Sequence, residues 1–414
     1  MFQNLKIAFF LATRQIKRGS KWTNVLIIFV MALTFLNLVV VSGILVGLIE
    51  GSVTAYRESY TGDLLIRNLD KKSYIEKSQD IIGAIEAMPE VLYYSARYME
   101  GGEIESQYKE KTKEDERDIG NATFAGIDPE KENQLSGISK FMVEGDYLLA
   151  DDFDKIIVGS LLIKKYTPIE AAGFTALEGI YPGAKVRVTI GENVRDVVVK
   201  GIIQSKVDDV SFKVYFPEKE FRSLIGRDDN NVDEIAVRLK PGVDPKIVKD
   251  ALLRTGFGQY AKIQTYEDAQ PKFLKDIKDT FALLGNAIGS IGLVVASITI
   301  FIVIFINAIT RRKYIGIMKG IGINGKAIEI SYVFQSLFYA IIGSAIGVFV
   351  VYVLLVPLFL AHPINFPFSD GILVAPLDSV LWKVGLLIFA TIIAGYIPAR
   401  MIVRRNTLDA ILGR

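Results

Sequence analysis

The sequence contains no cysteine and a single histidine, His362, among its 414 residues. Without cysteine the fold cannot rely on disulfide bridges, and Cys-ligated zinc sites and iron–sulfur clusters are excluded. One histidine argues against a His-rich metal site and against a Ser-His-Asp triad. Basic and acidic residues number 48 and 46, a net charge of +2. This balance argues against a nucleic-acid-binding protein, unless the basic residues gather on one surface.

Motifs that carry chemistry are also missing. The sequence has no Gly-x-x-x-x-Gly-Lys-Ser/Thr loop, so it gives no sign of ATP hydrolysis by a P-loop. It has no His-Glu-x-x-His, Gly-x-Ser-x-Gly or calcium-loop pattern. Acidic pairs at 151–152, 208–209 and 228–229 offer carboxylates to a hard cation, but solvated acidic loops are the simpler interpretation. We therefore expect no catalytic residue, no metal site and no cofactor in this chain. The missing motifs also argue against an enzyme that acts outside the membrane.

Charged residues are absent from four long stretches. Asp, Glu, Lys and Arg are missing from residues 22–49, 280–310, 330–369 and 384–399. A membrane-spanning helix needs about 20 apolar residues. The third stretch holds a span and then a proline-marked loop, and the fourth is long enough if it begins at Leu377, with Lys383 extending to the interface. We predict transmembrane helices over residues 22–49, 280–310, 328–356 and 377–399.

A cleaved signal peptide is the alternative interpretation of the first stretch. Such a peptide has an apolar core of about 7–15 residues followed by a small-residue cleavage site. Here the apolar stretch has 28 residues and follows 21 others, so a retained helix is favoured.

Basic residues concentrate in three short segments beside the predicted spans. Residues 1–21, 311–327 and 400–414 together hold 14 basic residues and one acidic residue, whereas the loop 357–376 holds no Lys or Arg. The positive-inside rule places these three segments, and both termini, in the cytoplasm. Residues 50–279, with 42 acidic and 33 basic residues, then lie outside the cell membrane.

The outside segment has the pattern of a soluble domain of mixed α and β structure. We predict strands over 62–67, 91–98, 121–127, 185–190, 196–203, 214–216 and 234–239, and helices over 73–88, 219–225 and 245–253. Residues 185–203 predict a hairpin, and the charge run 109–118 predicts a solvated loop or hairpin tip. The predicted fold is an α-helical membrane protein with four transmembrane helices and an inserted α+β extracytoplasmic domain of two subdomains.

The predicted spans carry few polar groups. An ion-coupled carrier needs ionisable residues near the middle of the membrane, and only Glu329 and Lys383 come close. Asn37, Asn286, Asn307 and Gln335 are interpreted as helix–helix hydrogen-bonding residues. Two small-residue motifs permit close approach of helices and are candidates for helix packing or a dimer contact. Their glycines are Gly285 and Gly289 in the second span, and Gly343 and Gly347 in the third.

Residues 311–326 form a basic segment directly after the second predicted span. A helix over 313–321 would present Ile315 and Met318 on one side and basic groups on another. Gly320, Gly322 and Gly325 would permit a break before the third span. Such a helix suits docking into a partner's groove, and equally a basic membrane anchor. Composition does not separate these two interpretations.

The same segment resembles the coupling helix of the MacB/FtsX-like permeases of the ABC transporter superfamily. Arg311, Ile315, Gly316, Ile317, Lys319 and Gly322 fit the family's pattern. Tyr314 stands where the family has Glu, Met318 where it has Leu and Gly320 where it has Ala, so the resemblance does not extend to a salt bridge from residue 314. The ATPase-coupling residues that the resemblance implies are Arg311, Tyr314, Ile315, Gly316, Ile317, Met318, Lys319 and Gly322.

Other segments resemble the same family. Residues 398–400 and 406–411 are similar to its C-terminal motifs, and residues 121–129, 144–145, 157–160 and 183–186 to its extracytoplasmic core domain, with 166–181 as an insertion. Residues 1–18 fit the family's amphipathic helix before the first span. Its apolar face would contain Phe2, Leu5, Phe9, Ala12 and Ile16.

The resemblance implies a permease subunit that works as a homodimer or heterodimer with a separate ABC ATPase, which would hold ATP and magnesium. Such a permease transmits ATP-driven motion to its extracytoplasmic domain. That motion would export or extract a lipidic, lipoprotein or peptide cargo, or activate an outside partner such as an adaptor, a lipoprotein or a hydrolase. Membrane lipid is a further expected partner. The alternative is a membrane-anchored receptor or adhesion protein without transport activity.

Overall fold

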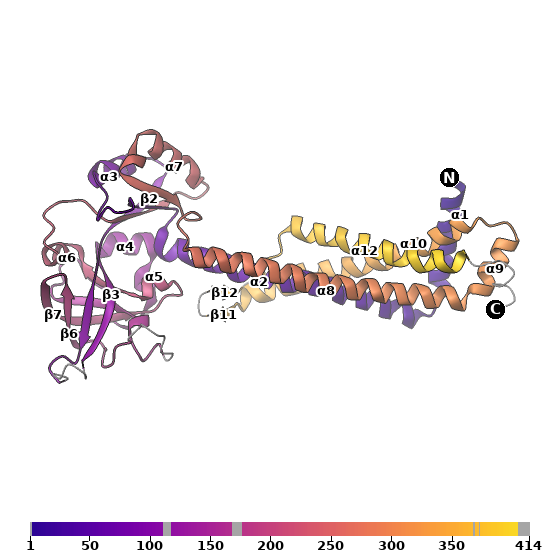
Figure 1. Cartoon of the computed structure of the whole chain (residues 1–414), viewed down its shortest axis with the longest axis horizontal. Coiled ribbons are helices and arrows are strands. Elements are labelled where there is room, and N and C mark those ends of the chain that lie inside the picture. Colours follow the sequence, from indigo (N-terminus) through magenta and orange to yellow (C-terminus); the bar gives the residue numbers. More distant parts are fainter. Residues whose placement is uncertain (1, 111–116, 168–175, 367–368, 372, 405–414) are drawn as a thin grey trace. The chain divides into compact units, whose positions relative to one another are not determined.

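The computed structural model describes residues 2–110, 117–167, 176–366, 369–371 and 373–404. It divides into two compact units (Figure 1). The helical unit comprises Met1–Ile49, Lys275–Asn365 and Asp370–Arg414, and the inserted domain comprises Glu50–Leu274 with Phe366–Ser369. The centre of the charge run, half of the insertion at 166–181 and the motif at 406–411 lie outside the described residues.

The helical unit is built from long apolar helices. Its elements are α1 (Phe2–Arg18), α2 (Lys21–Tyr56), α8 (Lys272–Thr310), α9 (Arg312–Gly320), α10 (Gly325–Phe349), the π-helical turn η6 (Val350–Leu355), α11 (Val356–Ala361) and α12 (Leu377–Val403). Among the described residues, four helical segments are long and apolar enough to cross a membrane: Lys21–Thr61, Leu274–Thr310, Gly325–Ala361 and Leu377–Val403. The predicted α-helical membrane architecture is therefore confirmed, and α2 continues past residue 49.

Glycines let α8 and α10 approach α2 closely. A Cβ atom placed on Gly343 of α10 would lie 2.5 Å from Cβ of Met31, and one on Gly347 would meet the Phe35 ring. On α8, a Cβ on Gly289 would lie 2.9 Å from Leu38 Cδ1. A Cβ on Gly285 would be in ordinary contact with α2, 3.5 Å from Ser42 Cα and from Leu45 Cδ1. The packing for which these glycines are needed thus occurs within this chain, and their use in a dimer contact stays a prediction.

A few polar contacts join the helices. Gln335 of α10 donates from Nε2 to Oε1 of Gln15 on α1 over 2.8 Å, as predicted for an interhelical hydrogen bond. The Tyr339 hydroxyl donates to Asn24 Oδ1 over 2.7 Å. The ammonium group of Lys383 donates to Ser42 Oγ on α2 over 2.5 Å, and its extension to the interface stays a prediction. Ser42 offers a nearby acceptor that satisfies one of its protons.

The inserted domain is organised around one ten-stranded sheet with the order β10-β1-β9-β2-β3-β8-β5-β7-β4, in which β6 pairs with β2 and β7. The strands are β1 (Leu64–Asn68), β2 (Val91–Ser106), β3 (Asp118–Ile127), β4 (Met142–Gly145), β5 (Lys155–Gly159), β6 (Lys185–Ile190), β7 (Asn193–Ile203), β8 (Lys213–Pro217), β9 (Glu234–Leu239) and β10 (Ala261–Thr265). Pairs β3–β8 and β5–β7 are parallel. The predicted hairpin is confirmed as β6–β7. Because all ten strands share a sheet, a division into two subdomains stays a prediction.

Short helices surround this sheet. They are the π-helical turn η1 (Arg57–Thr61), α3 (Ser78–Glu86), α4 (Pro129–Ser136), α5 (Asp208–Ser211), α6 (Glu218–Leu224), α7 (Pro245–Arg254) and the 3₁₀ turns η3 (Ile138–Phe141), η4 (Ser160–Leu162) and η5 (Phe257–Gln259). Outside the sheet, β11 (Ile364–Phe366) pairs with β12 (Ser369–Gly371). The predicted α+β composition of the domain is thus confirmed.

The core of the inserted domain comes from the alternating apolar residues that the sequence shows. Phe124, Phe216 and Phe221 are fully buried. The Phe216 ring contacts the rings of Phe124 and Phe221, with centroids 6.1 and 5.6 Å away.

Two predicted boundaries in the inserted domain are wrong. The helix expected from residue 73 begins at Ser78, because Lys77 has a left-handed backbone with φ +56°. Asp118, expected in a solvated tip, opens β3 and is buried, since it accepts hydrogen bonds from Ser106 Oγ and the Glu178 amide.

Candidate functional site

Helix α9 is a short helix held between α8 and α10. It ends at Gly320, and two residues later Gly322 has a φ of +92°, which only glycine adopts without strain. The Gly322 amide donates to the Lys319 carbonyl over 3.1 Å and the Ile323 amide to the Met318 carbonyl over 2.9 Å. These two bonds form a Schellman motif, which satisfies carbonyls at the end of the helix. The predicted glycine break before the third span is therefore confirmed.

The two faces of α9 differ in exposure. Ile315 is 2% exposed and Met318 packs beside it, so both belong to the core of the helical unit. On the other face Tyr314, Ile317 and Ile321 are 68%, 44% and 73% exposed. We call these three residues the α9 outer face. An apolar stripe left in contact with solvent is a feature of protein-binding surfaces.

The orientation of α9 exposes some of the residues that are expected to couple with an ATPase and buries others. Tyr314 and Ile317 are exposed, whereas Ile315 and Gly316 are buried and cannot reach a partner while α9 stays packed. Ile315 and Met318 thus lie on the side of α9 that packs against the other helices, and the ATPase-coupling role of the predicted residues stays a prediction. Sequence periodicity finds an apolar side but not the direction in which it points.

Lysine 319 fixes α9 to the end of α12. Its Nζ donates to the backbone carbonyl of Val403 over 3.0 Å. Gly325, at the start of α10, also lies close to Val403, because a Cβ atom on this glycine would be 3.3 Å from Val403 Cγ1. Buried Ala399, in the C-terminal motif 398–400, lies one turn before Val403. Lys319 and Gly325 thus hold α9 and the start of α10 against the end of α12.

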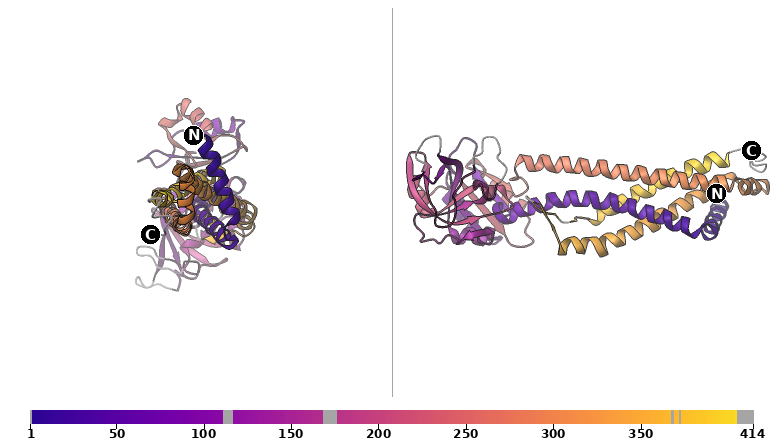
Figure 2. Two further views of the ribbon diagram at one scale, coloured as in Figure 1. Left: turned by 90° about the vertical axis from the view of Figure 1, so that its right-hand side faces the viewer. Right: turned by 90° about the horizontal axis from the view of Figure 1, so that it is seen from below.

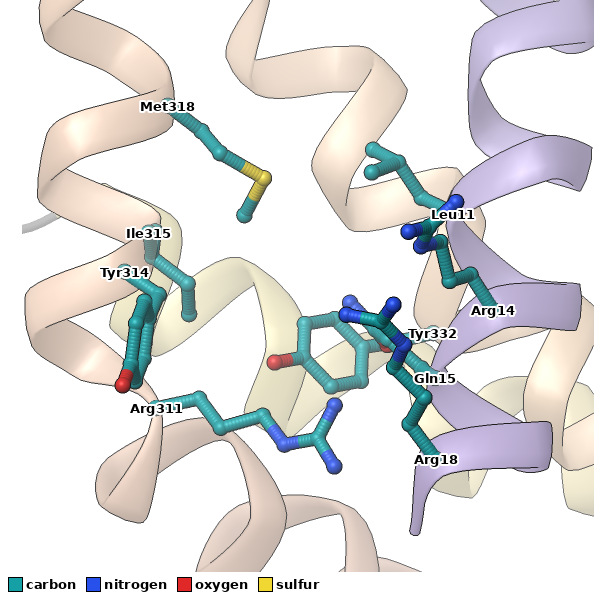
Figure 3. A pocket seen from close by; sticks show the side chains of 9 residues that line it. All are labelled: Leu11, Arg14, Gln15, Arg18, Arg311, Tyr314, Ile315, Met318 and Tyr332. Atoms are coloured by element: carbon teal, nitrogen blue, oxygen red, sulfur yellow. The ribbon is translucent and has the colours of Figure 1, made fainter.

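A pocket of about 520 Å³ lies between α1, α9 and the start of α10 (Figure 3). We call it the arginine pocket. Its lining residues are Leu11, Arg14, Gln15, Arg18, Arg311, Tyr314, Ile315, Met318 and Tyr332. Figure 3 shows Arg18 from α1 and Arg311 from the α9 side extending into the same space, with Tyr332 behind them. The sequence interpretation identified Arg311 but missed Arg14 and Arg18, whose spacing of four residues on α1 was the available signal.

A buried ionic network occupies the inserted domain beside η1. We call it the Arg97 network, and its members are Tyr60, Arg67, Arg97, Glu132, Lys213 and Glu234. Arg97 donates to Glu132 through two bonds of 2.8 Å and to Glu234 Oε1 over 2.6 Å. Arg67 donates from Nε to Glu234 Oε2 over 2.8 Å. Bidentate pairing of this kind fixes the relative positions of strand β2, helix α4 and strand β9.

Tyr60 connects this network to the first long helix. It lies in η1, which continues α2 without a break. Its hydroxyl donates to Glu234 Oε2 over 3.0 Å and accepts from Lys213 Nζ over 2.7 Å, while its carbonyl accepts from Arg97 Nη2 over 2.8 Å. A π-helical turn often occurs at a functional position. Here it places Tyr60 so that the end of α2 is bonded to three strands of the sheet.

The charges in the network are balanced by one another. Burial alone would raise the pKa of Glu234, but the charges of Arg67, Arg97 and Lys213 outweigh it and lower the pKa from 4.5 to about 2. Burial likewise opposes ionisation of Glu132, but the charge and hydrogen bonds of Arg97 lower its pKa. Both carboxylates are therefore ionised at neutral pH.

A second set of contacts satisfies backbone carbonyls of η1. Arg238 on β9 donates from Nη2 to the carbonyls of Arg57 and Glu58, over 3.2 and 2.9 Å. Arg57 donates in turn from Nε to Asp63 Oδ1 over 2.6 Å, and Asp63 Oδ2 accepts the Leu239 amide over 2.8 Å. These bonds occupy carbonyls that a helix end leaves unpaired. The end of α2 is thus attached to β9 at two independent places.

Asp152 and Asp229, from two of the acidic pairs that were considered for a cation, have other partners. Asp152 accepts from Lys155 Nζ over 2.7 Å and from the Leu149 amide over 2.8 Å, and it also pairs with Lys200. Asp229 accepts the Asn231 amide over 2.8 Å. Within the described ranges, no three His, Asp or Glu side chains are arranged to hold a metal ion.

The structure thus defines a class of protein, a multi-span membrane protein with a large inserted domain and a short exposed helix between two spans. Comparison with known proteins shows what its C-terminal part is similar to. Residues 286–407 match the model of the FtsX-like permease C-terminal family. That match includes the larger part of α8, all of α9 and both spans after it, and it confirms the resemblance to the MacB/FtsX-like ABC transporter permeases.

Individual relatives agree with this match. A macrolide export ATP-binding/permease protein MacB of Campylobacter fetus is 25% identical over 229 residues, which are 53% of this chain and 34% of the relative. A probable export ATP-binding/permease protein of Pseudomonas fluorescens is 24% identical over 205 residues, 49% of this chain and 30% of the relative. The chain therefore spans about a third of the length of these curated relatives.

Two solved structures are similar to the chain at low identity. The periplasmic region of MacB from Actinobacillus actinomycetemcomitans has a TM-score of 0.36 and 15% identity, and covers 51% of this chain and 92% of that one. The extracellular domain of the transporter YknZ from Gram-positive bacteria has a TM-score of 0.33 and 12% identity, and covers 49% of this chain and 99% of that one.

Proposed function

We propose that this chain is the permease subunit of an ABC transporter and that it transmits ATP-driven motion from a separate ATPase to the inserted domain. The observation that carries the proposal is the α9 outer face. Tyr314, Ile317 and Ile321 are exposed on a helix whose opposite side is buried, and this helix lies in the region matching the FtsX-like family. An ATPase groove that takes up this stripe would move α9 as a rigid piece.

The route from α9 has identifiable parts within each unit. In the helical unit, Lys319 bonds α9 to α12, and glycines bring α8 and α10 onto α2. In the inserted domain, Tyr60 and Arg238 bond the continuation of α2 to the sheet. The continuation of α2 into η1 is the segment through which the proposed shift would reach the Arg97 network.

The proposal includes an orientation and a cargo class. Both termini and α9 lie in the cytoplasm, as the basic flanking segments favour, and the inserted domain lies outside. A dimer of permeases works with two ATPases, which hold ATP and magnesium. The inserted domain then exports or extracts a lipidic, lipoprotein or peptide cargo, or activates an outside partner. Export is the activity named for both reported relatives, and the name of the Campylobacter fetus protein specifies macrolides.

The test is co-purification of the full chain with the ABC ATPase encoded beside it. Ile317→Asp places a charge in the α9 outer face and should abolish the complex. Ile247→Asp is the matched control, because Ile247 is a 64% exposed isoleucine on α7 of the inserted domain. A membrane-anchored receptor or adhesion protein predicts instead that no ATPase is recovered and that both variants behave as the wild type.

A further inference from the structure

Three positively charged side chains line the arginine pocket, and no described residue neutralises their charge. Arg14, Arg18 and Arg311 all line it, and among the described residues none of the three has a carboxylate partner. In the inserted domain, by contrast, the buried Arg97 is paired with Glu132 and Glu234. Three guanidinium groups around one space repel one another unless an anion lies between them. The pocket therefore has the electrostatics of an anion site.

A buried hydroxyl in the same pocket is also without a partner. Tyr332 is 1% exposed and lines the pocket, and its hydroxyl makes no hydrogen bond to any described residue. A buried hydroxyl is normally hydrogen-bonded, and leaving it unpaired costs about 1–3 kcal/mol. This group supplies a neutral donor beside the arginines, and is independent of the charge argument.

The remaining walls of the pocket are apolar. Leu11, Ile315 and Met318 supply aliphatic and thioether surface on two different helices. A site for a small inorganic anion needs no such surface. An anionic group that is covalently joined to a hydrocarbon matches a pocket of about 520 Å³ with both kinds of wall.

The helices around the pocket carry the features of a membrane–water interface. Helix α1 crosses the ends of the long helices (Figures 1 and 2) and exposes Phe9 and Phe10, at 63% and 59%. Trp22, at the start of the first span, is 85% exposed. Amphipathic helices in the plane of the membrane and exposed tryptophans at span ends lie at the level of the lipid headgroups. The pocket is therefore at the depth where lipid phosphates occur.

We propose that the arginine pocket binds the phosphate of an anionic phospholipid headgroup. Arg14, Arg18 and Arg311 donate to the phosphate oxygens, the Tyr332 hydroxyl donates one further bond, and the glycerol region lies against Leu11 and Met318. Such a lipid joins α1 to α9, since its ligands come from both helices. The site adjoins the α9 outer face, with which it shares Tyr314, but its proposed ligands are other residues, so lipid binding is measured on the chain without an ATPase.

Lipid binding to the delipidated full chain tests this proposal. The chain is purified in a non-ionic detergent and titrated with dioleoylphosphatidylglycerol, and bound lipid is counted by native mass spectrometry. Dioleoylphosphatidylcholine, which has the same chains and no net charge, is the lipid control. The double variant Arg14→Gln/Arg18→Gln removes two ligands from α1, where loss of folding is not expected. Lys17→Gln removes a positive charge from the same helix outside the pocket and is its matched control.

The wild type should retain one phosphatidylglycerol per chain in preference to phosphatidylcholine. Each arginine removed should weaken that binding about fivefold, so the double variant should bind about 25-fold more weakly. Lys17→Gln should bind as the wild type does. Tyr332→Phe, which removes only the hydroxyl, should weaken binding without changing the preference for the charged lipid. Agreement of all four results supports the site.

Three results would overturn the proposal. If the double variant binds phosphatidylglycerol as tightly as Lys17→Gln, the lipid lies elsewhere. If inorganic phosphate at millimolar concentration displaces the lipid and is itself retained equally well, the pocket binds free phosphate. If the arginine variants keep the lipid but fail to recover the ATPase, the pocket belongs to a protein interface.

Discussion

Arg97 and Glu132 face each other in the interior of the inserted domain, where each is about 3% exposed and two hydrogen bonds of 2.8 Å join them. Arg97 lies on β2 and Glu132 on α4, and the arginine continues to Glu234 on β9. A buried pair of this kind gives little net stability by itself, but loss of one partner leaves a buried charge uncompensated. The network is therefore sensitive to single substitutions.

Glu132→Gln should destabilise the inserted domain by about 3–5 kcal/mol, because Arg97 would lose its bidentate partner in a buried site. The measurement is thermal or denaturant unfolding of the full chain in detergent. The control is Glu76→Gln, which breaks the solvent-exposed pair with Lys72 and should leave unfolding unchanged. Equal unfolding of the two variants would show that the Arg97–Glu132 pair does not form in solution.

Stability should fall as acid protonates the network. The pKa of Glu234 is lowered to about 2 in the folded state, against an ordinary value of 4.5. A lowered folded-state pKa means that this stabilisation is complete above about pH 4.5 and is lost as the pH falls toward 2. Unfolding temperatures at pH 7, 5 and 3 check this. A transition whose acid sensitivity lies entirely above pH 5 would contradict the role of Glu234.

Tyr60→Phe should reduce the transmission of motion to the inserted domain while leaving that domain folded. The variant keeps the ring but loses the hydroxyl that bonds Glu234 and Lys213, so the inserted domain should stay folded with a loss of about 1–3 kcal/mol. ATPase binding at α9 should be unaffected, whereas the export or activation output should fall. Output at the wild-type level would show that η1 does not transmit the motion.

Gly343→Ala should loosen the packing of α10 on α2. The added methyl group would lie 2.5 Å from Met31 Cβ and 3.1 Å from the backbone nitrogen of Ala32, so the helices must move apart. A cost of about 1–3 kcal/mol is expected from overpacking. Gly385→Ala is the control, because nothing lies within 4 Å of a Cβ at that position of α12. The check is unfolding of both variants in lipid nanodiscs, where no difference between them would refute the contact.

The parts of the structure that depend on local pattern were predictable. The four spans follow from uninterrupted apolar stretches, the β6–β7 hairpin from alternation around Gly191, and the end of α9 from Gly322. Each of these signals lies within a few tens of residues, where periodicity and turn chemistry act.

The parts that depend on distant contacts were not predictable. Tyr60 and Glu234 are separated by 174 positions in the sequence, and no local pattern relates them. The side of α9 that faces the core was not predictable either, because Ile315 packs against core residues that come from other helices. The arginine pocket needs α1 to lie beside Arg311, almost 300 positions away in the sequence.

The central claim is that the α9 outer face docks an ATPase, and the absence of cysteine makes it directly measurable. Single cysteines at Tyr314, Ile317 and Ile321 would be labelled with a maleimide in the full chain, with and without the ATPase. Ile247→Cys in the inserted domain is the control. Docking at α9 predicts rapid labelling of all four positions in the free chain and protection of the three α9 positions alone when the ATPase is bound. Labelling of Ile317→Cys at the same rate with and without a bound ATPase would contradict it.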